Sequence, residues 1–512
     1  MSRTACLISV GLFAVATFMA GTAIAQKSAD TLRVAITEPF PTLSPYFNPA
    51  TEASFINQAV FQRLIGYDER NSKYVPVVAK SWKRVNDTTL EFDLFDDIKF
   101  HNGDALTADD VVYTFRYVAD PKVNFRNKQY YLWVKNVEKL GPYKIRVTAK
   151  EFNALDLFHF AFRGQVEDAK VHEKLDDRAE YGRKTPVGSG PYKVTKFDRN
   201  SGVSLTRSTT FKSGPYERAP IKNLEALFIT DPQTQIAQLL TDNVDLVFNV
   251  APDNAKALDA NPNIDVTVID SLTGLYLMFD GLGRSSNKAL ADVRVRKAMA
   301  MAIDRDALIK NVVPGGSVAR RLDAMCFDSM EACGYTLKPP AYDPDGAKKL
   351  LAEAGYPNGF DFVLDTQIRA RDVAQAIGGM LYRVGIRTTV NTVNTIIMFK
   401  RWEDGEVQGL LNNSPAGNWP DASKLLDNVF GVAARDTIRD PVILKGIEAG
   451  FGSHDPAKRK AEYTTVFNRI NELTSHLPIS SVPVVWAHLK TVKIDSNPLS
   501  ETQSNVTDVF WK

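Results

Sequence analysis

The sequence is poor in the residue types that most often build chemical sites. It has three cysteines and six histidines in 512 residues, and no two histidines stand at a spacing typical of metal ligands. Lysine plus arginine (62) nearly balances aspartate plus glutamate (60), which gives a formal net charge of +2. This balance argues against a nucleic-acid binder and against a polybasic membrane binder. The composition, 44% hydrophobic and 24% charged, is that of an ordinary globular protein.

Catalytic motifs are also scarce. The stretch PVGSGPY (Pro186–Tyr192) lacks the G-x-S-x-G order of a nucleophile elbow, and the Gly-Lys-Ser/Thr of a P-loop does not follow it. It is typical of a tight turn before a strand. We therefore predict no catalytic residue and no enzyme. A secreted hydrolase built on Ser189, His101 and Asp104 stays open as an alternative, and a periplasmic chaperone with an apolar cleft is a weaker one.

The long uncharged run of the sequence lies at its N-terminus. Arg3 is followed by an uncharged, mostly apolar stretch that ends in Ala23-Ile24-Ala25. Small residues at the third and first positions before a cut suit signal peptidase, so we predict a cleavable signal peptide over residues 1–25 rather than a membrane anchor. Cys6 lies far from the predicted cut, so no lipid attachment is expected. The sequence thus predicts an exported, soluble protein.

Cleavage would leave two cysteines, Cys326 and Cys333. An oxidising compartment permits a disulfide between them, which would close a short loop and stabilise the fold by roughly 2–3 kcal/mol. A soft metal site that also uses Met325 and Met330 is the alternative. Histidine is absent from this stretch of sequence, which favours the disulfide.

The apolar patterns predict alternating strands and helices. Thr89–Phe95 alternates apolar and polar residues, as in a half-buried strand. Leu224–Thr230 and Val244–Val250 read as strands around a helix that begins at Asp231-Pro232, a βαβ unit that requires a partly parallel sheet. A later helix begins at Asp343-Pro344 and stops at Gly355. Since one core stops growing at roughly 250–300 residues, we expect two α/β lobes joined by several crossings.

The stretch KFHNGDALTADDVV (Lys99–Val112) contains residue types that are common in catalytic and metal sites. Its pattern nevertheless predicts a turn followed by the start of a helix. Asn102-Gly103 is a turn pair. Thr107 and Asp110 have the spacing of a capping box, with Asp in place of the usual Glu. We therefore expect a helix to begin here, and we expect replacement of His101 to leave ligand binding intact.

Several stretches together resemble family 5 of the extracellular solute-binding proteins, the peptide/nickel group that serves ABC importers. They occur in the order and spacing of that family between about Thr31 and Asn497. They are VPVVAKSWKRVNDTTLEFDLFDDIKFHNGDALTADDVVYTF (Val75–Phe115), PVGSGPYKV (Pro186–Val194), LADVRVRKAMAMAIDRDALI (Leu290–Ile309), YDPDGAKKLLAEAGYPNGFDF (Tyr342–Phe362) and HLPISSVPVV (His476–Val485).

The resemblance implies an α/β fold of two lobes, the periplasmic-binding-protein fold of cluster C type with an additional inserted domain. Domain I would be discontinuous and comprise residues 26–60, 186–271 and 479–512. Domain II would be an insertion over residues 61–185, and domain III would span residues 272–478. The ligand would be enclosed between domains I and III.

The resemblance also implies which residues touch the ligand. In peptide-binding members an aspartate of domain III pairs with the ligand ammonium, and Asp421 falls at that position after Gly417, Asn418 and Trp419. Arg371 matches an arginine that contacts the ligand carboxylate in dipeptide-binding relatives, and Arg369 is the second choice. The alternative is that Asp421 caps a helix and Arg371 is a solvated surface charge.

The site departs from the family where the substrate is chosen. Pro415 stands where a tryptophan is usual, and Ala422 replaces the usual proline. Asn418 stands where relatives often carry an acid, and Thr395 stands near a usual aromatic position. The resemblance implies a monomer without cofactor, metal or nucleic acid, which binds a di- or oligopeptide and serves an inner-membrane ABC permease with its ATPase subunits. Opines, amino-acid derivatives, sugars and metal chelates remain alternative solutes.

Overall fold

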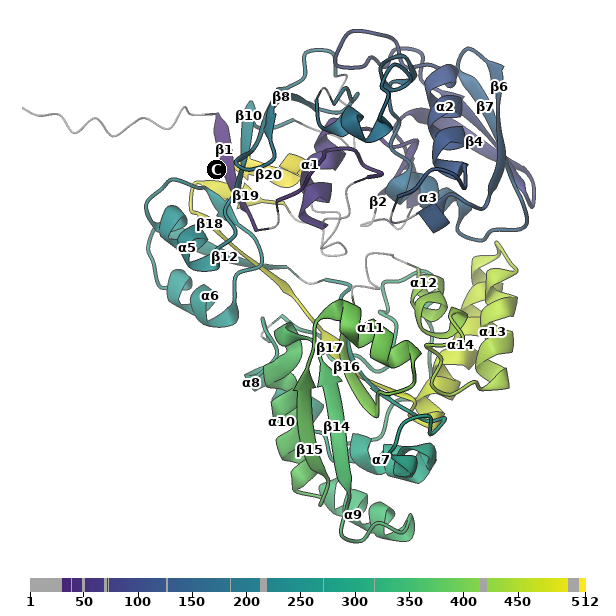
Figure 1. Cartoon of the computed structure of the whole chain (residues 1–512), viewed down its shortest axis with the longest axis vertical. Helices are drawn as coiled ribbons and strands as arrows, with labels where there is room; N and C mark the ends of the chain where they lie inside the picture. Colours follow the sequence, from purple (N-terminus) through teal and green to yellow (C-terminus); the bar gives the residue numbers. More distant parts are fainter. Residues whose placement is uncertain are drawn as a thin grey trace, which may run out of the picture.

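The computed structural model describes residues 30–37, 39–47, 51–68, 71, 73–125, 128–184, 186–211, 219–269, 271–316, 318–414, 421–495 and 506–512. They form two lobes stacked along the long axis of the molecule (Figure 1). We call residues 30–269 and 484–512 the upper lobe and residues 271–482 the lower lobe. The predicted signal peptide, 1–25, lies outside the described residues. Among these residues, no helix combines the length and apolarity needed to cross a bilayer.

The first sheet of the upper lobe has seven strands in the order β12-β18-β11-β1-β10-β9-β8. The predicted βαβ unit is confirmed: β10, α5 and β11 follow one another, and β1 lies between the two strands and parallel to both. The strands are β1 (Thr31–Ile36), β8 (Tyr192–Asp198), β9 (Gly202–Arg207), β10 (Asn223–Phe228), β11 (Leu246–Val247), β12 (Ile264–Ile269) and β18 (Val484–Leu489). The accompanying elements are α1 (Thr51–Val60), α5 (Pro232–Leu240), α6 (Pro252–Asp259) and the pair β19 (Val492–Ile494) and β20 (Val509–Trp511).

The second sheet of the upper lobe is antiparallel, with the order β4-β5-β7-β6. Its strands are β4 (Ala79–Asn86), β5 (Thr89–Leu94), β6 (Val134–Gly141) and β7 (Lys144–Ala149), and the hairpin β2 (Ile65–Asp68) and β3 (Lys73–Pro76) precedes it. Its helices are α2 (Ala108–Ala119), α3 (Asp156–Arg163) and α4 (Ala169–His172), with short turns at η1 (Lys128–Tyr130) and η2 (Arg178–Gly182).

The predicted half-buried character of β5 is wrong. Every residue of the strand except Asp93 is buried, because β5 lies inside the sheet between β4 and β7. Glu91 is 6% exposed and is paired with Arg146 at 2.7 Å and Lys83 at 3.2 Å. Hydrogen bonds from Arg146 and Lys83 lower the pKa of Glu91 to about 2. The alternation therefore marks a charged residue that cross-strand cations neutralise, not a solvated face.

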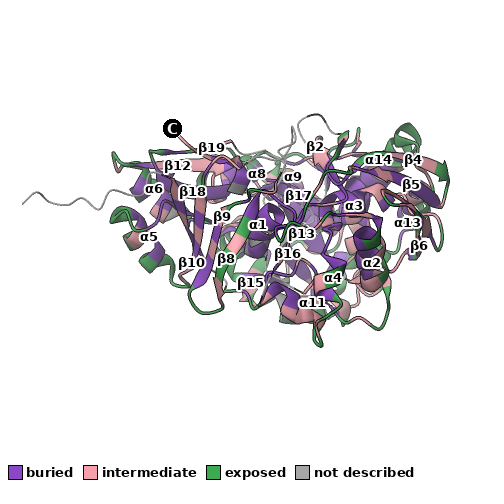
Figure 2. Cartoon of the chain, turned by 90° about the horizontal axis from the view of Figure 1, so that it is seen from above, coloured by how far each residue is buried: buried purple, intermediate pink, exposed green. Residues whose placement is uncertain are grey.

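The lower lobe is built on a five-stranded sheet with the order β15-β14-β16-β13-β17. Its strands are β13 (Gly274–Phe279), β14 (Asp361–Thr366), β15 (Arg387–Thr392), β16 (Gly409–Ser414) and β17 (His476–Ser481). Its helices are α7 (Val293–Met301), α8 (Arg305–Asn311), α9 (Pro344–Glu353), α10 (Arg371–Tyr382), α11 (Thr395–Glu403), α12 (Ala422–Leu426), α13 (Pro441–Phe451) and α14 (Pro456–Leu473), with short turns at η3 (Lys288–Ala291), η4 (Ile368–Ala370) and η6 (Asp427–Gly431). Seen from above, many strands are coloured as buried, and exposed residues lie mostly on outer helix faces and loops (Figure 2).

Helix starts follow the predicted caps. Asp343 accepts a hydrogen bond from the Gly346 amide at 2.9 Å at the start of α9, and Gly355 has φ +94° just after its end. At the start of α2, the Thr107 amide donates to Asp110 at 2.9 Å, and the Thr107 hydroxyl accepts from the first turn. The predicted capping box is thus confirmed, and its residues stabilise the start of the helix.

Two crossings join the lobes. β12 of the upper lobe leads into β13 of the lower lobe, and β17 returns to β18. The crossings are tied together, since the Val482 amide donates to the Thr273 carbonyl at 2.8 Å and the Ser271 hydroxyl donates to the Val482 carbonyl at 2.8 Å. β17 pairs with β13 as far as Ser481, and the chain then continues into β18.

Candidate ligand site between the lobes

The parallel strands of the lower lobe end at the boundary with the upper lobe. β14 runs parallel to β15 and β16, and these strands end at the top of the lower lobe, where α11 and α12 face the upper lobe (Figure 1). In open α/β sheets, ligands bind just beyond the carboxyl ends of the strands. The region between the two lobes at this edge is therefore the candidate ligand site.

A buried charge cluster lies at the start of α12. Asp421 is the N-cap of the helix, is 3% exposed and accepts from the Ser423 amide at 2.8 Å. One terminal nitrogen of Arg459, from α14, donates to both Asp421 oxygens at 2.8 Å. The other terminal nitrogen lies 3.3 Å from a Glu331 oxygen. Because two carboxylates share one guanidinium, the cluster of Asp421, Glu331 and Arg459 carries a net negative charge when both acids are ionised.

The electrostatics of the cluster extend to the upper lobe. Burial raises the pKa of Glu331, and repulsion by Asp421 adds to the shift while Arg459 opposes it. Burial alone would lower the pKa of Arg459, but the charge of Asp421 and its hydrogen bonds outweigh it, so the pKa rises. Burial also raises the pKa of Tyr74, on β3 of the upper lobe, and the charges of Glu331 and Asp421 raise it further. The phenol of Tyr74 therefore lies close to the cluster across the boundary between the lobes.

A disulfide fixes the Glu331 side of the cluster. Cys326 and Cys333 are bonded, with Cα atoms 5.8 Å apart. Glu331 lies inside this closed loop, and its carbonyl accepts from the Ala422 amide at 3.0 Å. The disulfide loop and the start of α12 are thus joined by their main chains. Neither Glu331 nor Arg459 is among the residues that the sequence predicts for the site. The position of Glu331 between the two cysteines was a signal, whereas Arg459 had none.

The other predicted site residues lie on other elements or outside the described residues. Arg371 begins α10 beyond the carboxyl end of β14; its side chain is 50% exposed, and its Nε donates to Asp372 at 3.2 Å. The Nε of Arg369 donates to the Gln367 side chain at 2.8 Å. Gly417, Asn418 and Trp419 lie outside the described residues. Asp421 caps a helix, which is the alternative considered from the sequence, and Arg371 has a half-exposed side chain paired with Asp372.

The residues considered for a hydrolase lie together but form no catalytic pair. His101 donates its main-chain amide to the Gly188 carbonyl at 2.8 Å, and its Nε2 bonds to the Gly190 carbonyl at 2.9 Å. The Ser189 side chain between them is 1% exposed, and its hydroxyl has no hydrogen-bond partner among the described residues. Burial lowers the pKa of His101 to about 4. This contact joins the two sheets of the upper lobe, and an occluded serine cannot reach a substrate.

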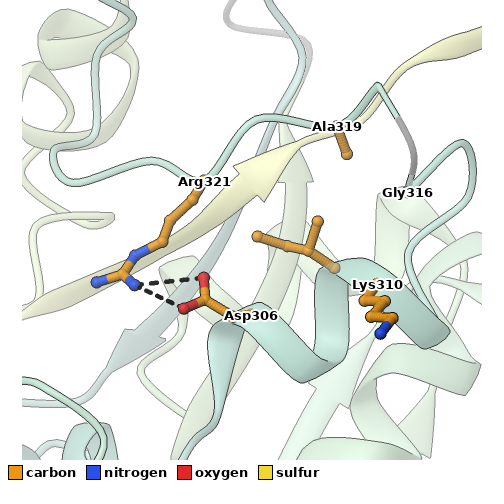
Figure 3. Close-up of a pocket in the computed structure, with 6 residues that line it drawn as sticks. Asp306, Lys310, Gly316, Ala319 and Arg321 are labelled. Carbon is orange, nitrogen blue, oxygen red and sulfur yellow. Dashed lines mark hydrogen bonds and ion pairs between the residues drawn. The ribbon is translucent and has the colours of Figure 1, made fainter.

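A hollow lies beside the crossings. A cavity of about 390 Å³ is lined by residues of α8 and the segment that follows it, and an ion pair between Asp306 and Arg321 joins the two segments at 3.0 Å (Figure 3). Asp306 is 70% exposed at its side chain, so this pair is a solvated one. The lining residues are Asp306, Ile309, Lys310, Gly316, Ala319 and Arg321. The cavity therefore offers no buried polar group to a ligand.

Known proteins resemble the chain over most of its length. Haem-binding protein A of Haemophilus influenzae is 28% identical over 404 residues, which cover 70% of each protein. A glutathione-binding protein of Shigella dysenteriae is 27% identical over 400 residues, 76% of this chain and 73% of the relative. A dipeptide-binding protein of Pseudoalteromonas, solved with Met-Leu, superposes with a TM-score of 0.75 at 19% identity, over 94% of this chain and all of the other. The predicted two-lobed periplasmic-binding-protein fold is thus confirmed.

The family follows from a match to a family model. Residues 73–436 match the model of the bacterial extracellular solute-binding proteins, family 5 (middle). The matched range begins at β3, includes the crossing from β12 to β13, and ends beyond α12. The chain therefore belongs to family 5 of the bacterial extracellular solute-binding proteins.

Proposed function

We propose that the protein is the periplasmic substrate-binding component of an ABC importer. It encloses a small solute between its lobes and delivers it to an inner-membrane permease that works with ATPase subunits. It acts as a monomer, without cofactor and without chemistry. The observation that carries this proposal is the family match over a chain whose two lobes are joined by paired crossings and meet at the carboxyl ends of parallel strands. The division into domains I, II and III belongs to the same proposal.

A di- or oligopeptide is the solute class that the charges favour. A zwitterion needs an anion for its ammonium group and a cation for its carboxylate. The net negative cluster of Asp421, Glu331 and Arg459 would supply the first, and Arg371 would supply the second. Glu331 is the more accessible carboxylate, since its side chain is 35% exposed against 4% for Asp421. We therefore place the ligand ammonium nearer Glu331 than Asp421.

The segment before α12 completes the proposed site. Gly417, Asn418 and Trp419 lie two to four residues before Asp421 in the sequence, and Asp421 itself is the buried N-cap of α12. A non-peptide solute is the alternative, because relatives in the same family are named for haem as well as for glutathione. The departures from the family at Pro415 and Ala422 fall in or beside this segment, where they would change the choice of solute.

The test is calorimetry and thermal unfolding of the purified protein with three probes: the dipeptide Met-Leu, glutathione and haem. We expect saturable one-to-one binding of one probe class and a rise in melting temperature with its concentration. Mass spectrometry of small molecules released by denaturation would then identify the native solute. Turnover of a peptide or ester panel that vanishes in Ser189→Ala would overturn the proposal in favour of a hydrolase.

Arg371→Ala tests the proposed carboxylate contact. A charged hydrogen bond contributes about 1.5–3 kcal/mol, so the Kd for Met-Leu should rise about 10- to 100-fold. Arg387→Ala is the matched control, because Arg387 is also an exposed arginine paired with an acid, at 2.6 Å from Asp361, but it begins β15 at the opposite end of the sheet. Equal Kd values for the two variants would remove Arg371 from the site.

A further inference from the structure

The two lobes also touch at a place away from the crossings. The turn between α13 and α14 of the lower lobe reaches the second sheet of the upper lobe, and both views place this hairpin beside that sheet (Figure 1, Figure 2). The imidazole of His454, in that turn, lies against the ring of Phe152, with centroids 4.3 Å apart. Phe451, the last residue of α13, packs on the core of the second sheet and also on the core of the lower lobe. We call Phe152, Phe451 and His454 the latch contact.

The upper lobe surrounds His454 with groups from three elements. Arg84 lies on β4, Asp87 in the turn after it, and Asp156 at the start of α3. His454 makes a hydrogen bond to the main chain of Asp87. Arg84 and Asp156 are held together by two hydrogen bonds of 2.8 Å, so their charges largely cancel beside the imidazole. The Nε2 atom of His454 is enclosed and has no hydrogen-bond partner among the described residues.

The imidazole acts here as a neutral aromatic ring. Burial lowers the pKa of His454, the charge of Arg84 lowers it further, and Asp156 and Asp87 oppose the shift. Ring contacts of this kind contribute more than their buried area alone, and they depend on a close and defined geometry. A rotation about the crossings that opens the lobes would part the two rings, because one ring belongs to each lobe.

We infer that the latch contact shifts the equilibrium of the ligand-free protein toward the closed form, independently of the solute. The residues lie outside the proposed ligand cluster, so their effect is the same for every solute that the lobes enclose. A ligand binds a two-state protein in proportion to the population of the binding-competent form. The latch therefore sets how much of the binding free energy is spent on closing the lobes. The inference rests on lobe closure in the proposed function but not on the identity of the solute.

The test measures closure without any ligand. Dyes attached at Lys135→Cys, on the exposed side of β6, and Glu448→Cys, on the exposed side of α13, report the distance between the lobes in single molecules by energy transfer. The protein is first freed of bound small molecules by unfolding and refolding with its disulfide intact. We expect a detectable closed fraction that falls at least fivefold in Phe152→Ala and in His454→Ala. The double variant should fall no further than either single one.

Two further variants serve as controls for the latch contact. Lys445→Ala, also on the exposed side of α13, should leave the closed fraction unchanged. His454→Phe keeps a ring against Phe152 and should retain more of the closed fraction than His454→Ala. Melting temperatures within about 2 °C of the parent protein would show that the lobes themselves stay folded. An unchanged closed fraction in both alanine variants would overturn the latch, and so would a parent protein that never closes without ligand.

The latch and the proposed function fail in different ways. If no probe in the calorimetry binds but the alanine variants still lose the closed fraction, the latch stands and the solute proposal fails. If a probe binds and the alanine variants close as often as the parent protein, the solute proposal stands and the latch is wrong.

Discussion

The starts of α2 and α12 look alike in sequence but are stabilised in different ways. Each carries a buried aspartate: Asp110 is 5% exposed and Asp421 is 3% exposed. Asp110 accepts from two main-chain amides, those of Thr107 at 2.9 Å and Ala169 at 3.1 Å. Asp421 also accepts from one main-chain amide, that of Ser423, but it is compensated in addition by the guanidinium of Arg459. Asp421 thus has a full opposite charge beside it, whereas the partners of Asp110 are main-chain amides and the Thr107 hydroxyl.

The difference shows why one site could be predicted and the other could not. The capping box of α2 uses a partner three residues away, so the sequence contains it whole. The partner of Asp421 lies 38 residues away, and its second acid, Glu331, lies 128 residues from Arg459. A buried acid with a distant partner is indistinguishable in sequence from a free acid that waits for a ligand.

Asp421→Ala should have the largest effect on stability. It leaves Arg459 buried with only part of its compensation, which costs about 3–5 kcal/mol of unfolding free energy by urea denaturation. Asp421→Ala combined with Arg459→Met should recover most of this loss, because an apolar pair of similar volume is often neutral. Asp427→Ala, which breaks only the partly exposed pair with Lys424, should cost less than about 1 kcal/mol. Full stability of Asp421→Ala with lost binding would instead make Asp421 a ligand residue alone.

The pH dependence of stability should show a smaller effect, which arises in the region of α2. Glu167 packs beneath α2, where its amide donates to Thr114, and burial raises its pKa to about 8. Between the unfolded pKa, near 4.3, and 8, the folded protein keeps a proton that the unfolded chain releases, so its stability falls as the pH rises.

Glu167→Gln should remove this loss. Relative to the variant, the parent protein should lose roughly 3 kcal/mol of unfolding free energy between pH 5 and pH 8. His172 lies beside Glu167 at 3.5 Å, and burial lowers its pKa to about 4, so it is neutral in both proteins over this range. Parallel pH profiles of the parent protein and Glu167→Gln would show that the buried acid does not hold its proton.

Asp110→Ala should have the smallest effect of the three. It removes an acceptor for two amides at the start of α2 and should cost about 1–2 kcal/mol in urea denaturation. Asp109→Ala is the control, since Asp109 is 67% exposed at its side chain and pairs with Lys139 at the surface. A loss in Asp110→Ala as large as that in Asp421→Ala would abolish the distinction between main-chain and charge compensation.

Local sequence patterns predicted structural elements correctly where the interacting residues lie close together in sequence. The starts of α5 and α9 and the end of α9 were predicted because an Asp-Pro pair or a glycine acts within a few residues. The burial of β5 was not, because the cations that neutralise Glu91 come from the neighbouring strands β4 and β7. The latch was invisible for the same reason, since Phe152 and His454 meet only when the lobes do.

The sequence alone determined the family, through the resemblance of several stretches to known members. It also determined the alternation of strands and helices and the helix starts, because periodicity and capping are short-range effects that each segment carries within itself. The tertiary structure decided which charges are free and which are compensated. It moved Asp421 into a buried pair, placed Glu331 beside it, turned His101 into a link between two sheets, and brought His454 to Phe152. These outcomes depend on how distant segments approach one another, and only the packed chain fixes that approach.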